Sequence, residues 1–317
     1  MAITLFKREE EQRKFLAVEK LNLLYNLVTT ILIIVFYNRL QQPQDMLLWR
    51  FLILAGTFTI IYIYSKFPSP VMRIARIITQ MALLSYWYPD TFEFNRIFPN
   101  LDHVFAQADL TLFCCQPAML FDQVCSNYWW REFFNFGYWS YYPMIIIVTL
   151  WYILKNPKET ERCTFIIIAS FYIYYLIYIF LPVAGPQFYF PVIGDELIAN
   201  GPYPAIGDYF NLHPEISIAQ EGKGGLFTTL VGIAQVSGER PTAAFPSSHI
   251  GISTILLILA FRTKKELGSF LIPCYLLLCC ATVYIKAHYL VDAIAGFISG
   301  ILFYILTAYI YDRKVKE

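Results

Sequence analysis

Charged residues are scarce in this chain. Only 15% of its 317 residues are Asp, Glu, Lys or Arg, whereas soluble domains contain about 25%. Hydrophobic residues make up 57% of the chain, aromatic residues make up 18%, and the mean hydropathy is +0.50. One water-soluble core cannot bury this much apolar surface, so the composition predicts a polytopic membrane protein.

The signatures of several other protein classes are also missing. The net charge is +1 and no basic cluster is present, so nothing indicates nucleic-acid binding. The seven cysteines form no Cys-x-x-Cys pair and no metal-ligand spacing with the four histidines, and we interpret them as small buried residues. No cleavable signal peptide, internal repeat or low-complexity tract is visible.

Long apolar segments separated by polar links predict about eight transmembrane helices, each of roughly 20 residues. The predicted spans are 21–37, 47–65, 71–88, 138–154, 163–181, 246–261, 268–285 and 289–310. Residues 89–135 suit interfacial helices, because they mix prolines and acids with tryptophans. Residues 182–245 form a long polar stretch. The expected fold is an all-α membrane helix bundle with a six-helix core and an additional N-terminal pair of helices.

This pattern predicts two domains. Residues 1–66 comprise a charged N-terminal segment, the charged lead, and a two-span hairpin, and residues 67–317 form a membrane-embedded domain. Lys and Arg concentrate on the cytoplasmic side of membrane proteins. With eight spans, 17 of the 24 Lys and Arg residues fall on the side of the two termini. We therefore expect both termini in the cytoplasm, the 182–245 stretch on the outer face, and a location in a bacterial inner membrane.

Residues 240–249 bring polar groups to this outer face. The segment begins with Arg240 and ends Pro246-Ser247-Ser248-His249. A proline suits the first position of a helix, which would leave the next N–H groups free to bind a phosphate. The alternative is a capped helix that carries an incidental histidine.

His288 and Asp292 are four residues apart, so they share one face of the last predicted span. An acid inside a span is costly and commonly functional. A carboxylate that accepts one imidazole N–H fixes the tautomer and leaves the other nitrogen free as a nucleophile. Gly296 and Gly300 continue the same stripe and favour close helix packing.

Two other interpretations of these residues remain open. The His–Asp pair could be a structural hydrogen bond. A metal site built from both motif histidines and Asp292 is the weaker interpretation, since no fourth ligand is evident, and no metal or cofactor is expected. His103 and His213 are expected to be ordinary interfacial or loop residues.

The order Arg-Pro, Pro-Ser-x-His and His-x-x-x-Asp over residues 240–292 resembles the phosphatidic acid phosphatase type 2 superfamily. This resemblance implies that His249 protonates the leaving group, that His288 attacks phosphorus, and that Asp292 orients His288. It also implies that the phosphate oxygens are held by Arg240 of the first motif and by Ser247 and Ser248 of the second.

The chain departs from the superfamily pattern at two cationic positions. Ile233 replaces the lysine of the first motif, and Ala281-Thr282 replaces the Ser-Arg of the third. Lys286 lies near the third motif and is a further candidate for phosphate binding. Fewer cations suit a singly charged phosphodiester better than a phosphate monoester, which is nearly a dianion.

The same departures resemble the inositol phosphorylceramide synthase (aureobasidin-resistance) branch, as do segments 108–113, 116–117 and 136–142, so this resemblance covers residues 95–305. It implies transfer of a phospho-headgroup from a phospholipid such as phosphatidylinositol to a lipid alcohol such as ceramide, through a phosphohistidine. The expected partners are a phospholipid donor, a lipid acceptor and the membrane, with no nucleic acid. Two alternatives are a lipid phosphate or polyprenyl diphosphate phosphatase that uses water, and an anion transporter, although a transporter should show repeats and paired broken helices.

Overall fold

The computed structural model describes residues 15–199, 201–213 and 224–315, so most of the predicted charged lead lies outside the described residues. The described chain consists of helices and connecting loops without a strand, which confirms the all-α prediction. The helices are α2 (Ala17–Val35), α3 (Pro43–Lys66), α4 (Pro70–Ala82), α5 (Leu84–Asn95), α6 (Asp102–Phe113), α7 (Pro117–Val124), α8 (Tyr128–Trp139), α9 (Tyr141–Lys155), α10 (Thr160–Phe180), α11 (Pro186–Ile193), α12 (Asp195–Ile198), α13 (Tyr209–Leu212), α14 (Leu226–Gly238), α15 (Ser248–Thr263), α16 (Lys265–Tyr284) and α17 (Leu290–Ile310).

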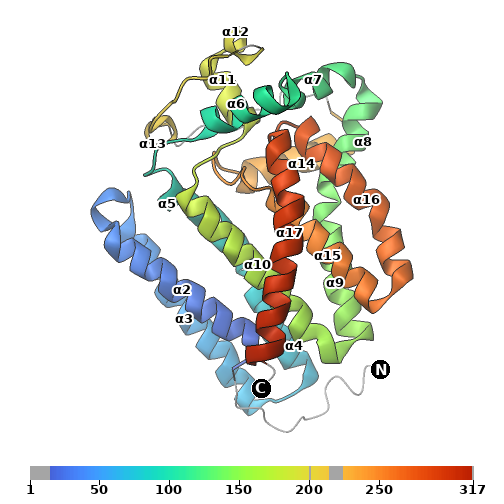
Figure 1. Ribbon diagram of the computed structural model, residues 1–317. Coiled ribbons are helices and arrows are strands. Elements are labelled where there is room, and N and C mark those ends of the chain that lie inside the picture. Colours follow the sequence, from blue (N-terminus) through green and yellow to red (C-terminus); the bar gives the residue numbers. More distant parts are fainter. Residues whose placement is uncertain (1–14, 200, 214–223, 316–317) are drawn as a thin grey trace.

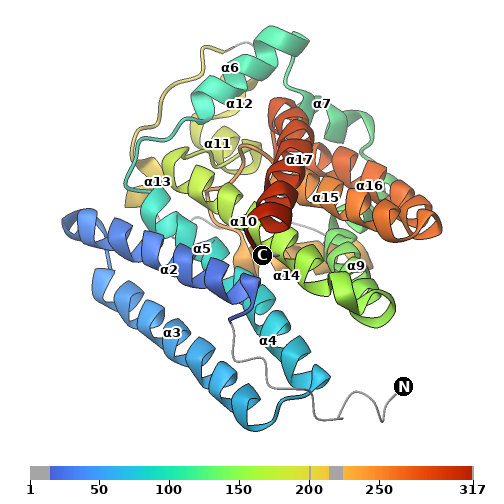
Figure 2. The ribbon, with the colours of Figure 1, turned by 60° about the horizontal axis from the view of Figure 1, so that its bottom comes forward.

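Helix α10 lies at the centre of the bundle. Figures 1 and 2 show α2 and α3 on one side of it and α15 and α16 on the other. Its apolar residues are distributed around the whole helix, which is typical of a helix buried on all sides. Four of its tyrosine hydroxyls hydrogen-bond to other elements: Tyr172 to Asn22 in α2, Tyr174 to Ser299 in α17, Tyr175 to the carbonyl of Leu84 in α5, and Tyr178 to the carbonyl of Pro246 before α15. The central helix thereby fixes the positions of its neighbours.

Five helices within the described residues are long and apolar enough to cross a membrane, which indicates a multi-pass membrane protein. They are α2, α3, α16 and the segments Pro157–Phe180 and Leu290–Arg313 that contain α10 and α17. Helices α9 and α15 are shorter, with 15 and 16 residues. The span predicted over 71–88 is two helices, α4 and α5, that meet at Leu83. The count of eight spans therefore stays a prediction.

The region predicted to be interfacial, 89–135, contains the end of α5, all of α6 and α7, and most of α8. Helices α6 and α7 are bent by 66° relative to each other and lie across one end of the bundle, above the start of α17 (Figure 1). Helix α8 instead packs along α16. A Cβ atom at Gly137 would lie 2.9 Å from the carbonyl oxygen of Leu277, so the absence of a side chain permits this close approach.

The α2–α3 hairpin is attached to α4 and α5 through buried charges. The guanidinium of Arg76 in α4 lies 2.6 Å from Glu19 in α2, and that of Arg50 in α3 donates to Asp90 in α5 at 2.8 Å. Charged side chains at membrane depth are costly unless they are paired. These two pairs therefore fix the hairpin against the next two helices, while the predicted domain boundary at residue 66 stays a prediction.

Helices α15 and α17 pack closely along a stripe of glycines. A Cβ atom at Gly296 would lie 2.5 Å from the carbonyl oxygen of Ser247, and one at Gly300 would lie 2.6 Å from that of Gly251. The predicted role of Gly296 and Gly300 in close packing is thus confirmed. Because the two helices start side by side, the two sequence motifs come together at one end of the bundle.

The opposite end of the bundle holds the start of α2 and the end of α17 (Figure 1). The N–H of Ala17 donates to Glu161 at 2.6 Å, and Arg162 pairs with Asp312 at 2.7 Å. These contacts hold the start of α2, the start of α10 and the residues just after α17 together at this end of the bundle. Both ends of the described chain therefore lie away from the two motifs.

Candidate active site

The two motif histidines face each other where α15 and α17 begin. His249 lies in the first turn of α15, and His288 lies in the loop between α16 and α17. Their ring centroids are 5.7 Å apart. His288 is buried, with 3% of its surface exposed, and His249 is partly exposed. One phosphoryl group could therefore contact both imidazoles.

The tautomer of His288 is set by a backbone carbonyl. Its Nδ1 lies 2.7 Å from the carbonyl oxygen of Ala244. A carbonyl can only accept a hydrogen bond, so Nδ1 carries the proton and Nε2 keeps its lone pair. Burial lowers the pKa of His288 to about 4, so this imidazole is neutral at neutral pH. Both properties are those of a nitrogen nucleophile.

The carboxylate of Asp292 is close to His288 but does not accept its proton. Its Oδ2 lies 3.8 Å from Nδ1 of His288 and accepts the N–H of Tyr289 at 2.9 Å. Its Oδ1 is buried without a hydrogen-bond partner. The expected hydrogen bond between the two side chains is thus replaced by the bond to Ala244, and Asp292 lies near His288 as a neighbouring carboxylate.

Backbone strain occurs in both loops that hold the nucleophile. Ala243, just before the accepting carbonyl, has φ +70°, and Lys286, two residues before His288, has φ +65°. A left-handed conformation costs a residue with a side chain roughly 1–2 kcal/mol. Strain of this kind persists only where surrounding contacts enforce it, and it is common at functional sites.

Helix α15 begins later than the sequence predicted. Its first residue is Ser248 and its N-cap is Ser247, whose hydroxyl accepts the N–H of Ile250 at 3.4 Å. Pro246 precedes the cap rather than opening the helix. The N–H of Ser247 donates to the carbonyl of Asp292 at 3.1 Å, and the N–H of Ser248 donates to the hydroxyl of Tyr178 at 3.0 Å. The N–H groups of Ser247 and Ser248, which were expected to bind phosphate, are therefore already engaged within the protein.

Arg240 hydrogen-bonds to the backbone of its own loop. Its side chain donates to the carbonyl of Glu239 at 3.0 Å. It also lines a separate cavity of about 350 Å³, together with the carboxylates of Asp45, Asp90 and Glu93.

Lys286 is engaged in an ion pair. Its Nζ lies 2.9 Å from Asp122 in α7, and the lysine side chain is 31% exposed. This pairing fixes the strained loop before His288 to α7. It also neutralises a cation that the sequence analysis had considered for phosphate binding.

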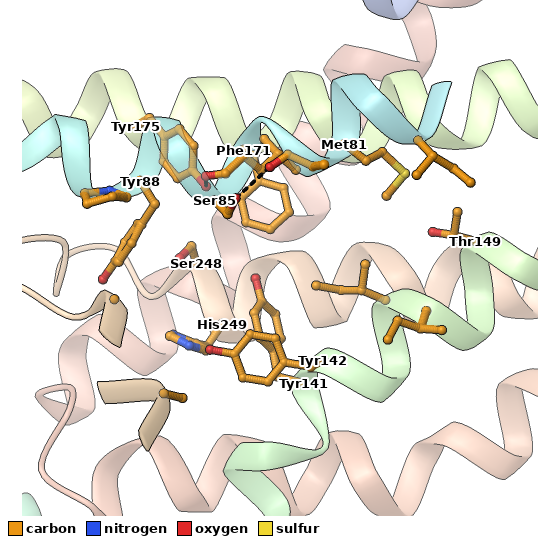
Figure 3. A pocket seen from close by; sticks show the side chains of 18 of the residues that line it. Met81, Ser85, Tyr88, Tyr141, Tyr142, Thr149, Phe171, Tyr175, Ser248 and His249 are labelled. Carbon is orange, nitrogen blue, oxygen red and sulfur yellow. Dashed lines mark hydrogen bonds between the residues drawn. The ribbon is translucent and has the colours of Figure 1, made fainter. Parts of the chain in front are cut away.

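A largely apolar cavity of about 530 Å³ leads away from His249. Figure 3 shows His249 and Tyr88 at one end of it and Met81 and Thr149 at the other. Ser248 and Glu239 also line the cavity, whereas His288 does not. Cavities of this size hold small-molecule ligands. Its polar end at a catalytic candidate and its apolar length suit a lipid.

Aromatic rings and a carboxylate complete the polar end of this cavity. The ring of His249 packs against Tyr138 and Tyr141, at centroid distances of 4.7 and 4.6 Å. The hydroxyl of Tyr138 donates to Glu239 at 2.6 Å, and Gln187 donates to the other carboxylate oxygen at 3.0 Å. Burial raises the pKa of the Glu239 carboxyl. Glu239 was not predicted from the sequence as a site residue, although it directly precedes the arginine of the first motif.

Two acids of α6 that the sequence analysis did not single out position the start of α17. Asp109 accepts the N–H groups of Leu290 and Val291 at 2.9 and 3.0 Å. Asp102 accepts the hydroxyl of Tyr289 at 3.0 Å and two N–H groups from the loop after α10. A carboxylate at the N-terminus of a helix is favourable. Asp109 lies inside segment 108–113, which is part of the resemblance described above. That resemblance could have indicated Asp109 from the sequence.

The remaining histidines and possible metal ligands lie outside this arrangement. His103 is on α6 and His213 follows α13, where its ring packs on Tyr209 at 4.4 Å. Neither lines the cavity. Across the part of the chain that the structure describes, no group of three or more His, Cys, Asp or Glu side chains is arranged to hold a metal ion.

Residues 103–306 match the family model described as the PAP2 superfamily. The match covers more than half of the chain, so the chain belongs to this superfamily. Its members are lipid phosphatases and phosphotransferases, which identifies the class of enzyme. No curated protein and no solved structure matches the chain.

Proposed function

We propose that this protein transfers a phosphate-linked headgroup from a phospholipid to a lipid alcohol through a phosphohistidine at His288. The observation that carries the proposal is the hydrogen bond from Nδ1 of His288 to Ala244, which leaves Nε2 free opposite His249. Membership of the PAP2 superfamily supports the same chemistry.

The first half-reaction forms the phosphohistidine. The lone pair of His288 Nε2 attacks phosphorus, and the bond from phosphorus to the lipid oxygen breaks. Protonated His249 gives its proton to that oxygen, so the lipid alcohol leaves neutral. This division of one displacement into two steps is the usual benefit of covalent catalysis, and proton transfer of this kind contributes about 10²- to 10⁴-fold.

The second half-reaction reverses the order of events with a different alcohol. The acceptor hydroxyl gives its proton to His249, and its oxygen attacks phosphorus. The bond between phosphorus and His288 then breaks, which restores both histidines. Water in place of the lipid alcohol would release the headgroup phosphate, which is the hydrolytic alternative.

The low positive charge of the site supports a phosphodiester substrate. Ile233, Ala281 and Thr282 supply no cation, Lys286 is paired with Asp122, and Arg240 adjoins three carboxylates. A monoester close to a dianion would need more compensation than a singly charged diester. Phosphatidylinositol as donor and ceramide as acceptor are the specific pair that we propose, on the resemblance of the motifs.

The test is incubation of the purified protein with phosphatidylinositol labelled in its headgroup, with and without ceramide. We expect labelled ceramide to form only when ceramide is present. Release of free inositol phosphate at the same rate in both reactions would show that the protein hydrolyses the donor and does not transfer its headgroup to ceramide. Label retained on protein during turnover should map to His288. Undiminished activity of His288→Ala would refute the mechanism.

A further inference from the structure

We infer that α4 and α5, which precede the family-matched residues 103–306, form the wall that selects the apolar chain of the lipid substrate. This inference rests on the proposed function and adds a determinant of substrate choice to it. Both helices lie in the part of the chain predicted from sequence to be the membrane-embedded domain, residues 67–317.

The wall is formed by one continuous stretch of sequence. The cavity beside His249 is lined from α4 and α5 by seven residues between positions 78 and 89. They are Ile78, Met81, Ala82, Leu84, Ser85, Tyr88 and Pro89. Helix α9 supplies the facing wall, and α10 contributes Phe171 and Tyr175 (Figure 3). One side of the cavity therefore consists entirely of residues outside the family match.

The shape of the cavity points to a single extended hydrocarbon chain. The lining residues of α9 run from Tyr141 to Ile153, which at 1.5 Å per residue is about 18 Å. One leaflet contributes about half of the ~30 Å hydrocarbon core of a bilayer. The cavity is therefore about as long as one lipid chain, with polar groups at the histidine end and aliphatic side chains at the other.

The position of His249 tells which part of the substrate this chain belongs to. His249 and Ser248 line the cavity, and His288 does not. In the proposed mechanism His249 gives a proton to the oxygen of the leaving alcohol. In the second step it takes the proton from the hydroxyl of the accepting alcohol. The chain in the cavity is therefore that of the lipid alcohol, and the transferred headgroup lies on the side of His288.

The wall is fixed by contacts that are independent of the substrate. Arg76 in α4 is paired with Glu19, and Asp90 in α5 is paired with Arg50. The hydroxyl of Tyr175 donates to the carbonyl of Leu84 at 3.3 Å, close to the junction of α4 and α5. A wall held in this way can discriminate between chains by shape.

The test fills the cavity from this wall and compares two substrates with the same headgroup. Ala82→Phe places a large ring in the lining, and Ala75→Phe makes the same change on α4 at a position that does not line the cavity. The two substrates are a long-chain phospholipid and a water-soluble aryl phosphodiester without a chain. We expect Ala82→Phe to lower kcat/KM for the long-chain lipid by about 10-fold or more. The aryl diester should be turned over within twofold of the parent rate, and Ala75→Phe should match the parent on both substrates.

A second variant tests the same wall if Ala82→Phe does not fold. Met81→Ala widens the same wall and should shift the preference toward bulkier chains, again without an effect on the aryl diester. Equal losses of Ala82→Phe on the long-chain lipid and the aryl diester, or an unchanged rate of Ala82→Phe on the long-chain lipid, would overturn the inference. Failure of the parent protein to turn over either substrate would instead refute the proposed function.

Discussion

Replacing Asp292 by Asn should slow phosphoenzyme formation through charge, with the tautomer of His288 unchanged. Attack on phosphorus places positive charge on the imidazole, and the nearest Asp292 oxygen is 3.8 Å from Nδ1. With an effective dielectric constant of ~20, a full charge at that distance is stabilised by about 4 kcal/mol and a half charge by about 2 kcal/mol. The rate should therefore fall by roughly 40-fold to 10³-fold.

The assay is rapid-quench measurement of label trapped on the protein, with an aryl phosphodiester as donor. An aryl leaving group needs little protonation, so the measured step depends on His288 and not on His249. Asp312→Asn is the matched control, because it removes a carboxylate just beyond the other end of α17, where Asp312 pairs with Arg162. That control should react at the parent rate.

Two results would refute this reasoning in different ways. A loss of less than about 10-fold in folded Asp292→Asn would show that the charge contributes little. A loss near 10⁴-fold, the size associated with a wrong tautomer, accompanied by a nitrogen NMR signal for unprotonated Nδ1, would show that Asp292 and not Ala244 sets the tautomer.

Four other changes test separate parts of the structure. Since burial lowers the pKa of His288 to about 4, the nucleophile stays neutral above that pH. Phosphoenzyme formation from the aryl diester should therefore persist from pH 7 to pH 5. A loss of phosphoenzyme formation centred near pH 6.5 would contradict this pKa. Gly296→Ala forces a Cβ atom to within 2.5 Å of the Ser247 carbonyl, so it should reduce thermal stability and turnover together, as measured by unfolding and assay of the same sample. Glu239→Gln removes a carboxylate beside His249 and should lower KM for an anionic donor, whereas an unchanged KM would show that the carboxyl is already neutral there. Single cysteines at Ala205 and Lys265, in a background without other cysteines, should react with an impermeant reagent from opposite faces of the membrane; labelling of both in intact cells would disprove the predicted topology.

The sequence was most informative where a pattern is local. Apolar length predicted α2, α3, α10, α16 and α17, and helical spacing predicted that Gly296 and Gly300 allow close packing. It was less informative for helix boundaries near proline, as at Pro246, because contacts made by Ser247 and Ser248 decide where α15 begins. The break at Leu83 left no signal in the apolar pattern.

Partners distant in sequence account for what could not be predicted at the site. The acceptor for His288 is the carbonyl of Ala244, 44 residues away, and every residue has such a carbonyl. Asp292 was the visible acid at helical spacing, so the sequence favoured it as the partner. The ion pair of Lys286 with Asp122 and the cap that Asp109 supplies to α17 likewise depend on tertiary packing.

The buried pairs between the hairpin and α4–α5 have a consequence for synthesis of the protein. Glu19 and Arg50 enter the membrane before their partners exist, because Arg76 follows Glu19 by 57 residues and Asp90 follows Arg50 by 40 residues. A charge at the centre of an inserting helix costs about 2.5–3.5 kcal/mol on biological insertion scales, and Glu19 and Arg50, which lie nearer the ends of α2 and α3, should cost less than this but still disfavour insertion. The first two helices therefore carry unneutralised charge until α4 and α5 emerge from the ribosome. A nascent chain arrested between residues 66 and 76 would lack both partners and should be a preferred target of membrane quality-control proteases, whereas a chain extended beyond residue 90 holds both pairs.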